Sequence, residues 1–211
     1  MRLRGGAGPV KSAGPLLYAR SRAVPVTLAA LAGTAAFAVW AAHRMDAYLD
    51  TYRRVPILAL APLLAAAVIG TSLHSASPEL DRTAVRPWWP RRLAQLLGLT
   101  AVAAVLLPAA VLGDAHAFGP PAMIRNILGC TGVTAVAAVL LGARLSWLPA
   151  FGYVSAVYLA TPGIRGHGVT LWAWPMQPGS APGAWAAALT AFAVGAALHA
   201  AYGSRPEGPG V

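Results

Sequence analysis

Long apolar stretches separated by short polar segments fill almost the whole chain. A helix of about 20 apolar residues, rising about 1.5 Å per residue, crosses a bilayer core about 30 Å thick. Because most of these stretches reach that length and carry almost no charge, the pattern predicts an all-α, polytopic membrane protein with six transmembrane helices. The predicted spans are residues 24–42, 55–73, 93–112, 122–141, 145–160 and 184–202.

The composition leaves little chain for a soluble domain, since 57% of the 211 residues are hydrophobic and only 10% are charged. We therefore expect a basic N-terminal segment (1–23), a six-helix membrane domain (24–203) and a short tail (204–211). The net charge of +10 is typical of proteins that bind nucleic acid. The cations flank apolar spans here and do not form one basic face, so we expect the lipid bilayer as a partner and no nucleic acid.

The distribution of cations predicts the orientation, because cytoplasmic loops carry an excess of Lys and Arg. With the N-terminus inside, eleven of the sixteen Lys and Arg residues fall on the cytoplasmic side, which places both termini in the cytoplasm. Heavy use of Arg, Ala, Gly and Pro indicates a GC-rich genome and hence a multi-pass protein of a bacterial plasma membrane. In an alternative interpretation residues 1–42 form a cleaved signal peptide, although the apolar core there exceeds the usual length of about 7–15 residues.

Proline residues lie inside three of the predicted spans, at Pro62, Pro108 and Pro149. Each lacks an N–H donor and tends to bend its helix. Two interpretations stay open: the bundle must bend or open, or the prolines only reflect the frequency of Pro in membrane helices.

The last span consists almost entirely of small residues. Ala187, Ala191 and Gly195 recur every four residues and therefore share one helix face. Small residues let helix backbones approach closely in lipid. We expect this face to pack against another helix of the chain or against a second copy of the protein.

The loop after the second span contains a predicted short helix. Ser77 is a favourable N-cap and Pro78 suits the first helical position, so we expect a helix over residues 78–85. This helix either docks into a groove of a partner protein or rests on lipid beside Trp88 and Trp89. The residues that would contact a partner are Pro78, Glu79, Leu80, Asp81 and Arg82.

Polar residues gather at the start of the fourth span. Arg125 and Asn126 lie just inside it, and Asp114 in the preceding loop is a candidate partner for Arg125. Ionisable residues in membrane helices face the bundle interior or a wet cavity and indicate a functional site. In the structural alternative, Arg125 extends to the outer headgroups and Asn126 hydrogen-bonds to a neighbouring helix.

The loop between the last two spans, residues 161–183, is rich in Gly and Pro and is accompanied by Trp172, Trp174 and Trp185. Tryptophan favours the membrane interface. The segment either lies there as an aromatic belt or dips into the bilayer as a lid or re-entrant turn.

The sequence contains no catalytic motif. A segment similar to a Walker A loop has Val10 where that motif requires Gly, and the five His residues show no metal-ligand spacing. We therefore expect no catalytic residue, no metal and no cofactor. One enzymatic hypothesis stays open: an intramembrane enzyme that acts on lipid through His116 with Asp114, or through His167.

The predicted topology, the helical second loop and the extended last outer loop together resemble the membrane subunit of ABC-2-type exporters. The segments Pro78-Glu-Leu-Asp-Arg-Thr-Ala-Val-Arg and Arg125-Asn-Ile-Leu-Gly-Cys-Thr-Gly are also similar to six-helix membrane proteins of actinobacteria. In the exporter family the loop after the second span contacts a separate ATPase, and the last outer loop contains re-entrant helical pieces.

The resemblance implies a permease-like subunit that is not itself an enzyme. It would work with a separate ATP-binding subunit and would pair with a second copy or a sister permease. All Asp and Glu residues lie outside the predicted spans, which argues against an independent proton-coupled carrier. The alternative function is that of a non-transporting accessory or assembly protein of the membrane.

Overall fold

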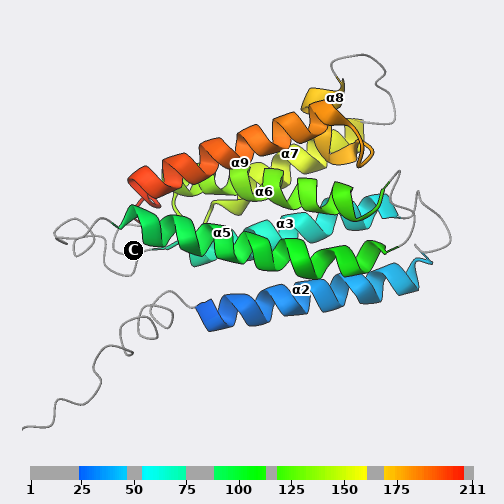
Figure 1. Ribbon diagram of the computed structural model, residues 1–211, viewed down its shortest axis with the longest axis horizontal. Helices are drawn as coiled ribbons and strands as arrows, with labels where there is room; N and C mark the ends of the chain where they lie inside the picture. Colours follow the sequence, from blue (N-terminus) through cyan, green and yellow to red (C-terminus); the bar gives the residue numbers. More distant parts are fainter. Residues whose placement is uncertain (1–23, 47–53, 75–87, 113–117, 161–168, 207–211) are drawn as a thin grey trace, which may run out of the picture.

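The structure, a computed structural model, describes residues 24–46, 54–74, 88–112, 118–160 and 169–206. In these ranges the chain is helical and has no strand, and six α-helices of 14 residues or more lie along the long axis of the molecule (Figure 1). The predicted all-α fold with six helices is confirmed. The helices are α2 (Val24–Arg44), α3 (Val55–Ser72), α5 (Trp89–Leu106), α6 (Pro120–Leu141), α7 (Trp147–Ala160) and α9 (Pro182–Tyr202).

Three short elements complete the described chain. A 3-10 helix, η3 (Leu107–Val111), continues α5, while α8 (Val169–Trp172) and a second 3-10 helix, η5 (Trp174–Met176), lie between α7 and α9. Five helices, with η3 counted as part of α5, are long and apolar enough to cross a membrane, so the chain is a membrane protein. The sixth, α7, has 14 residues and spans about 21 Å, which is less than a hydrocarbon core of about 30 Å.

The two ends of the bundle differ in charge. We call the end where α2 and α5 begin and α3, α6 and α9 stop the basic end, because its described residues include Arg91, Arg92, Arg144 and Arg205. The orientation of this end toward the cytoplasm stays a prediction.

Helix α6 occupies the centre of the bundle. It packs against α3, α5, α7 and α9, and its contact with α9 is the most extensive between any two helices of the described chain. A Cβ atom on Gly132 would lie 2.4 Å from the backbone of Ala191, and one on Gly195 would lie 2.3 Å from the carbonyl oxygen of Gly132. The face of α9 that carries Ala191 and Gly195 therefore packs within the chain, against α6.

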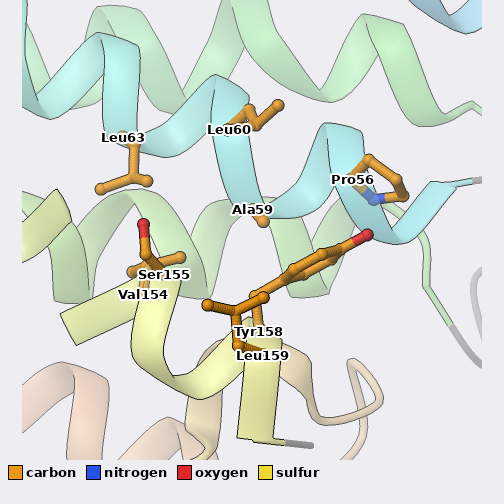
Figure 2. Close-up of a pocket in the computed structure, with 8 residues that line it drawn as sticks. All are labelled: Pro56, Ala59, Leu60, Leu63, Val154, Ser155, Tyr158 and Leu159. Carbon is orange, nitrogen blue, oxygen red and sulfur yellow. The ribbon is translucent and has the colours of Figure 1, made fainter. Parts of the chain in front are cut away.

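The packing of α7 on α3 leaves an apolar groove of about 300 Å³ between the two helices (Figure 2). Tyr158 and Leu159 of α7 and Leu60 of α3 are exposed along it. The lining residues are Pro56, Ala59, Leu60, Leu63, Val154, Ser155, Tyr158 and Leu159.

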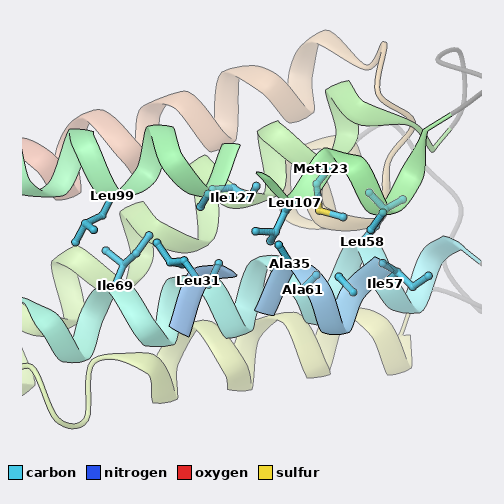
Figure 3. Packing of buried hydrophobic residues seen from close by; sticks show 14 of the residues in the cluster. Leu31, Ala35, Ile57, Leu58, Ala61, Ile69, Leu99, Leu107, Met123 and Ile127 are labelled. Carbon is cyan, nitrogen blue, oxygen red and sulfur yellow. The ribbon is translucent and has the colours of Figure 1, made fainter. Parts of the chain in front are cut away.

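Buried side chains form two clusters that share α3, α6 and α9. In the first, Leu31 of α2, Ile69 of α3 and Leu107 of η3 are among the residues that interdigitate (Figure 3). In the second, Val154 of α7 and Trp174 of η5 pack with α3, α6 and α9. Helix α2 belongs to the first cluster alone and has most of its surface exposed.

The three prolines in the predicted spans have different structural effects. Pro62 lies inside α3. Pro108 coincides with the change from α-helix to 3-10 helix at Leu107, as expected where a missing N–H breaks the i to i−4 ladder. Pro149 lies within α7, as predicted, but only two residues after the first residue of the helix, Trp147. Pro149 therefore occupies the first turn, where no N–H is needed.

At the basic end, hydrogen bonds satisfy carbonyl groups near the ends of α6 and α9. Gly142 and Gly203 adopt positive φ and end α6 and α9, donating to the carbonyls of Ala138 and His199. Arg205 donates its backbone N–H to Ala138 (2.9 Å) and its Nη1 to Leu140 (3.1 Å). The first residues after α9 are thereby docked on the bundle.

From the close approach of α6 and α9 we predict that an added methyl group at their contact lowers the stability of the protein. Gly195→Ala should lower the free energy of unfolding by about 1–3 kcal/mol, because its methyl group overlaps the α6 backbone. Gly152→Ala on α7, where nothing lies within 4 Å of the added atom, is the matched control and should be neutral or slightly stabilising. Unfolding in detergent, followed by circular dichroism, measures both; equal effects would contradict this packing.

Candidate functional site

Arg125 and Asn126, in the second turn of α6, form the most polar buried group of the described chain. Their exposed fractions are 0% and 1%, and both lie in a helix apolar enough to span the membrane. We call this pair the clamp. The interpretation in which Arg125 extends to the outer headgroups is wrong, because its guanidinium group points into the protein.

The guanidinium group of Arg125 binds neutral oxygen atoms. Nη1 donates to the carbonyl of Pro178 (2.7 Å) and Nη2 to that of Gln177 (2.8 Å). Nε and Nη2 both donate to Oδ1 of Asn126 (3.1 Å each). Four of the five N–H groups of the side chain therefore have acceptors within the described residues.

The amide of Asn126 links the clamp to two further elements. Its Nδ2 donates to the carbonyl of Leu58 on α3 (2.9 Å) and to that of Pro175 in η5 (2.8 Å). The prediction that Asn126 hydrogen-bonds to a neighbouring helix is confirmed. The orientation of the amide follows from its partners, since the guanidinium group only donates and the carbonyls only accept.

The bond to Leu58 has a specific cause in α3. In an α-helix the carbonyl of residue 58 accepts from the N–H of residue 62, but Pro62 has no N–H. The freed carbonyl lies inside the bundle, where an unpaired oxygen is costly. Asn126 of α6 supplies the missing donor.

The clamp holds a stretch of chain that enters the bundle without forming a long helix. We call residues 169–179, which contain α8 and η5, the inserted segment. Trp174 is 5% exposed, and its neighbours Ala173 and Met176 are also buried. In the loop 161–183, residues 173–176 therefore pack inside the bundle, while Leu171 and Trp172 are exposed at its surface.

Side chains from three helices bind backbone oxygens of the inserted segment. Beside the clamp, Tyr153 of α7 donates its hydroxyl to the carbonyl of Trp172, and Trp185 of α9 donates Nε1 to that of Gly179 (2.8 Å). Backbone groups buried in a membrane must find partners within the protein. The polar side chains at this end of the bundle thus meet a requirement that the inserted segment creates.

The depth of insertion is set by a glycine on α6. A Cβ atom on Gly129 would lie 2.2 Å from the ring of Trp174, so the ring fills the space that any other residue would occupy. Gly129 is nine residues after Pro120, or about 13 Å along the helix. The ring also stacks on Tyr153, with centroids 6.0 Å apart.

Other residues of the predicted sites lie apart from the clamp or outside the described chain. Ala187, Ala191 and Gly195 are on α9, where the last two meet α6. Asp114, His116 and His167 lie outside the described residues. So do the predicted partner contacts Pro78, Glu79, Leu80, Asp81 and Arg82.

The clamp is suited to holding backbone. Of the six acidic residues of the chain, Asp46 alone falls in the described ranges, and its helix α2 ends away from α6. No group of three metal-ligating side chains occurs among the described residues. Sequence reasoning found Arg125 and Asn126 but missed Gly129 and Tyr153, whose roles depend on where Trp174 lies.

Comparison of the chain with protein-family models, with curated proteins and with solved structures finds no match. The function must therefore be inferred from the architecture itself.

The bond between Asn126 and Leu58 predicts an energetic coupling to Pro62. Asn126→Leu should destabilise the protein by about 1–3 kcal/mol, because it leaves buried carbonyls unpaired. Pro62→Ala restores the N–H that Leu58 lacks, so the double variant should recover about 0.5–2 kcal/mol relative to additivity. Asn126→Leu combined with Gly152→Ala is the control and should be additive; additivity of both pairs would contradict the proposed link.

The rate of chemical labelling of Cys130 should measure how firmly the inserted segment is packed in the bundle. Cys130 is buried in the cluster that contains Ala173 and Trp174, so a membrane-permeant maleimide should label it slowly. Arg125→Met removes the donors to Gln177 and Pro178, and it should raise the labelling rate roughly tenfold by increasing local opening.

Arg144→Met, at an exposed turn of the basic end, is the control for that experiment. It should leave the labelling rate of Cys130 unchanged. A rate that is the same in Arg125→Met and in the wild type would show that the clamp does not hold the inserted segment.

Proposed function

We propose that this chain is the permease-like membrane subunit of an ABC-type exporter in a bacterial plasma membrane and works with a separate ATPase. The observation that carries the proposal is the inserted segment between the last two long helices. It matches the re-entrant pieces expected in the last outer loop of ABC-2-type exporters. Its 3-10 helix η5 packs inside a bundle of the expected six helices, and α8 lies beside it at the surface.

In such a transporter, helix α3 would connect the end that contacts the ATPase to the end that holds the inserted segment. At one end it carries the Leu58 carbonyl that Asn126 binds. At the basic end it stops at Ser72, just before the segment 78–85 that is expected to contact the ATPase. A displacement of that loop would act on α3, and α3 is joined to the inserted segment through the clamp.

The transport pathway of the proposed exporter would lie between two membrane subunits. Within the described bundle, Ala and Leu side chains fill the space between helices, and the clamp groups are engaged by backbone. A second copy or a sister permease would therefore supply the other wall. Hydrolysis of ATP would be the chemistry of the partner.

A second candidate function is that of an accessory or assembly protein without transport. The filled core and the engagement of the buried clamp by backbone favour it. The two candidates differ in their partners, since an accessory protein needs no ATPase.

Purification from native membranes tests the proposal. The tagged full-length chain should retain an ATP-binding subunit, detected by azido-ATP labelling and by vanadate-sensitive ATP hydrolysis. Replacing Glu79, Leu80 and Asp81 by Ala should reduce the retained activity roughly tenfold, as expected when central contacts of an interface are truncated.

Arg144→Ala changes another loop position at the same end and should retain the ATPase. Absence of any ATPase from the wild-type preparation, with the chain folded, would reject the exporter and leave the accessory function. Full retention by the triple variant would reject the assigned contact segment.

A further inference from the structure

A groove of about 370 Å³ runs between α2 and α5, starting at the basic end. This volume lies in the range of ligand sites, roughly 300–1,000 Å³. Its lining is apolar, and the side chain of Arg91 borders it at the basic end. The lining residues are Val24, Leu28, Arg91, Ala94, Gln95, Gly98, Leu99 and Val102.

The length of the groove corresponds to one leaflet of a bilayer. Arg91 and Val102 are eleven residues apart on α5, which is about 16 Å along the helix axis. Half of a hydrocarbon core of about 30 Å is about 15 Å. A chain that starts beside Arg91 and follows the groove would therefore end near the middle of the membrane.

From the basic end inward, the residues along the groove change from polar to apolar, as a phospholipid changes from headgroup to acyl chain. At the membrane surface, the Arg91 guanidinium lies 4.9 Å from the ring centroid of Trp88, and tryptophan prefers headgroup depth. The amide of Gln95 is turned to α3, where Nε2 donates to the carbonyl of Ser72 (3.1 Å). Beyond it, Gly98, Leu99 and Val102 provide an apolar path.

A glycine keeps this path open. A Cβ atom on Gly98 would meet nothing within 4 Å, unlike one on Gly132 or Gly195, where neighbouring backbone fills the space. Gly98 is therefore not required for helix packing. A longer side chain at this position would project into the groove.

Two other grooves have no basic residue along them. The groove between α3 and α7 (Figure 2) and the groove between α2 and α3 have no charged residue in their linings. The described part of the basic end carries four Arg residues and no acidic residue. Charge complementarity therefore favours an anionic headgroup at the groove that starts there.

We propose that the groove between α2 and α5 is a binding site for an anionic phospholipid, whose phosphate contacts Arg91 and whose acyl chain follows the apolar path past Gly98 to Val102. The proposal needs only that the helices cross a membrane. It is independent of the exporter proposal.

Native mass spectrometry of the full-length protein in detergent tests the site. Phosphatidylglycerol and phosphatidylcholine with identical acyl chains are titrated, and lipid-bound masses are counted. The wild type should retain phosphatidylglycerol several-fold more than phosphatidylcholine. Arg91→Gln should remove this preference, and Gly98→Leu should weaken the binding of both lipids by blocking the acyl path.

Two controls separate the site from general effects of charge and size. Arg144→Gln removes a cation at the same end but outside the groove, and Gly33→Leu adds the same side chain at an open position of α2. Both should bind lipid as the wild type does. Equal retention of the two lipids by the wild type would overturn the proposal, as would unchanged binding by Gly98→Leu. A dimer that Gly98→Leu abolishes without changing lipid binding would also overturn it, since the groove would then hold a second copy.

Discussion

The burial of non-helical backbone in a membrane is the constraint on which the candidate site depends. The inserted segment brings the carbonyl of Pro175 into the bundle, where water is not available to bind it, and those of Gln177 and Pro178 to partly buried positions at its edge. Arg125 and Asn126 donate to all three. An Arg at the centre of a membrane helix costs about 2.5–3.5 kcal/mol by insertion scales. Arg125 lies nearer the end of α6, where the cost is smaller, and these hydrogen bonds offset it. The charge is retained because a guanidinium group presents several donors in one fixed plane.

The clamp also relates two features that are far apart in the sequence. Pro62 frees a carbonyl on α3, and the inserted segment carries others more than a hundred residues later. One amide, that of Asn126, serves both. The carbonyl freed by Pro62 and the inserted segment therefore share a partner, and a change in either one alters the environment of the other. This shared partner is the physical basis for placing α3 on the route between the two ends of the proposed exporter.

Hydrophobic pattern and length were sufficient to predict the helices, because each span must bury its own backbone and expose apolar side chains to lipid. The ends of α3 and α6 follow the prediction within about two residues, the usual ambiguity of helix ends. The depth of Trp174 could not be predicted in this way. It depends on contacts such as that of Trp174 with Gly129, which join residues distant in sequence and leave no periodic signal.

At both ends of α6 an arginine binds backbone oxygens. The guanidinium group of Arg125 holds the inserted segment beside the first turns, and at the last turn Arg205 donates its guanidinium to the carbonyl of Leu140 and its backbone N–H to that of Ala138. Close backbone contact with α9 at Gly132 fixes its middle. Helix α2 contributes apolar contacts to a single cluster, and a groove separates part of it from α5. The most extensive helix contact of the described chain, that of α6 with α9, therefore lies at the centre of the bundle, whereas α2 lies at its edge with most of its surface exposed.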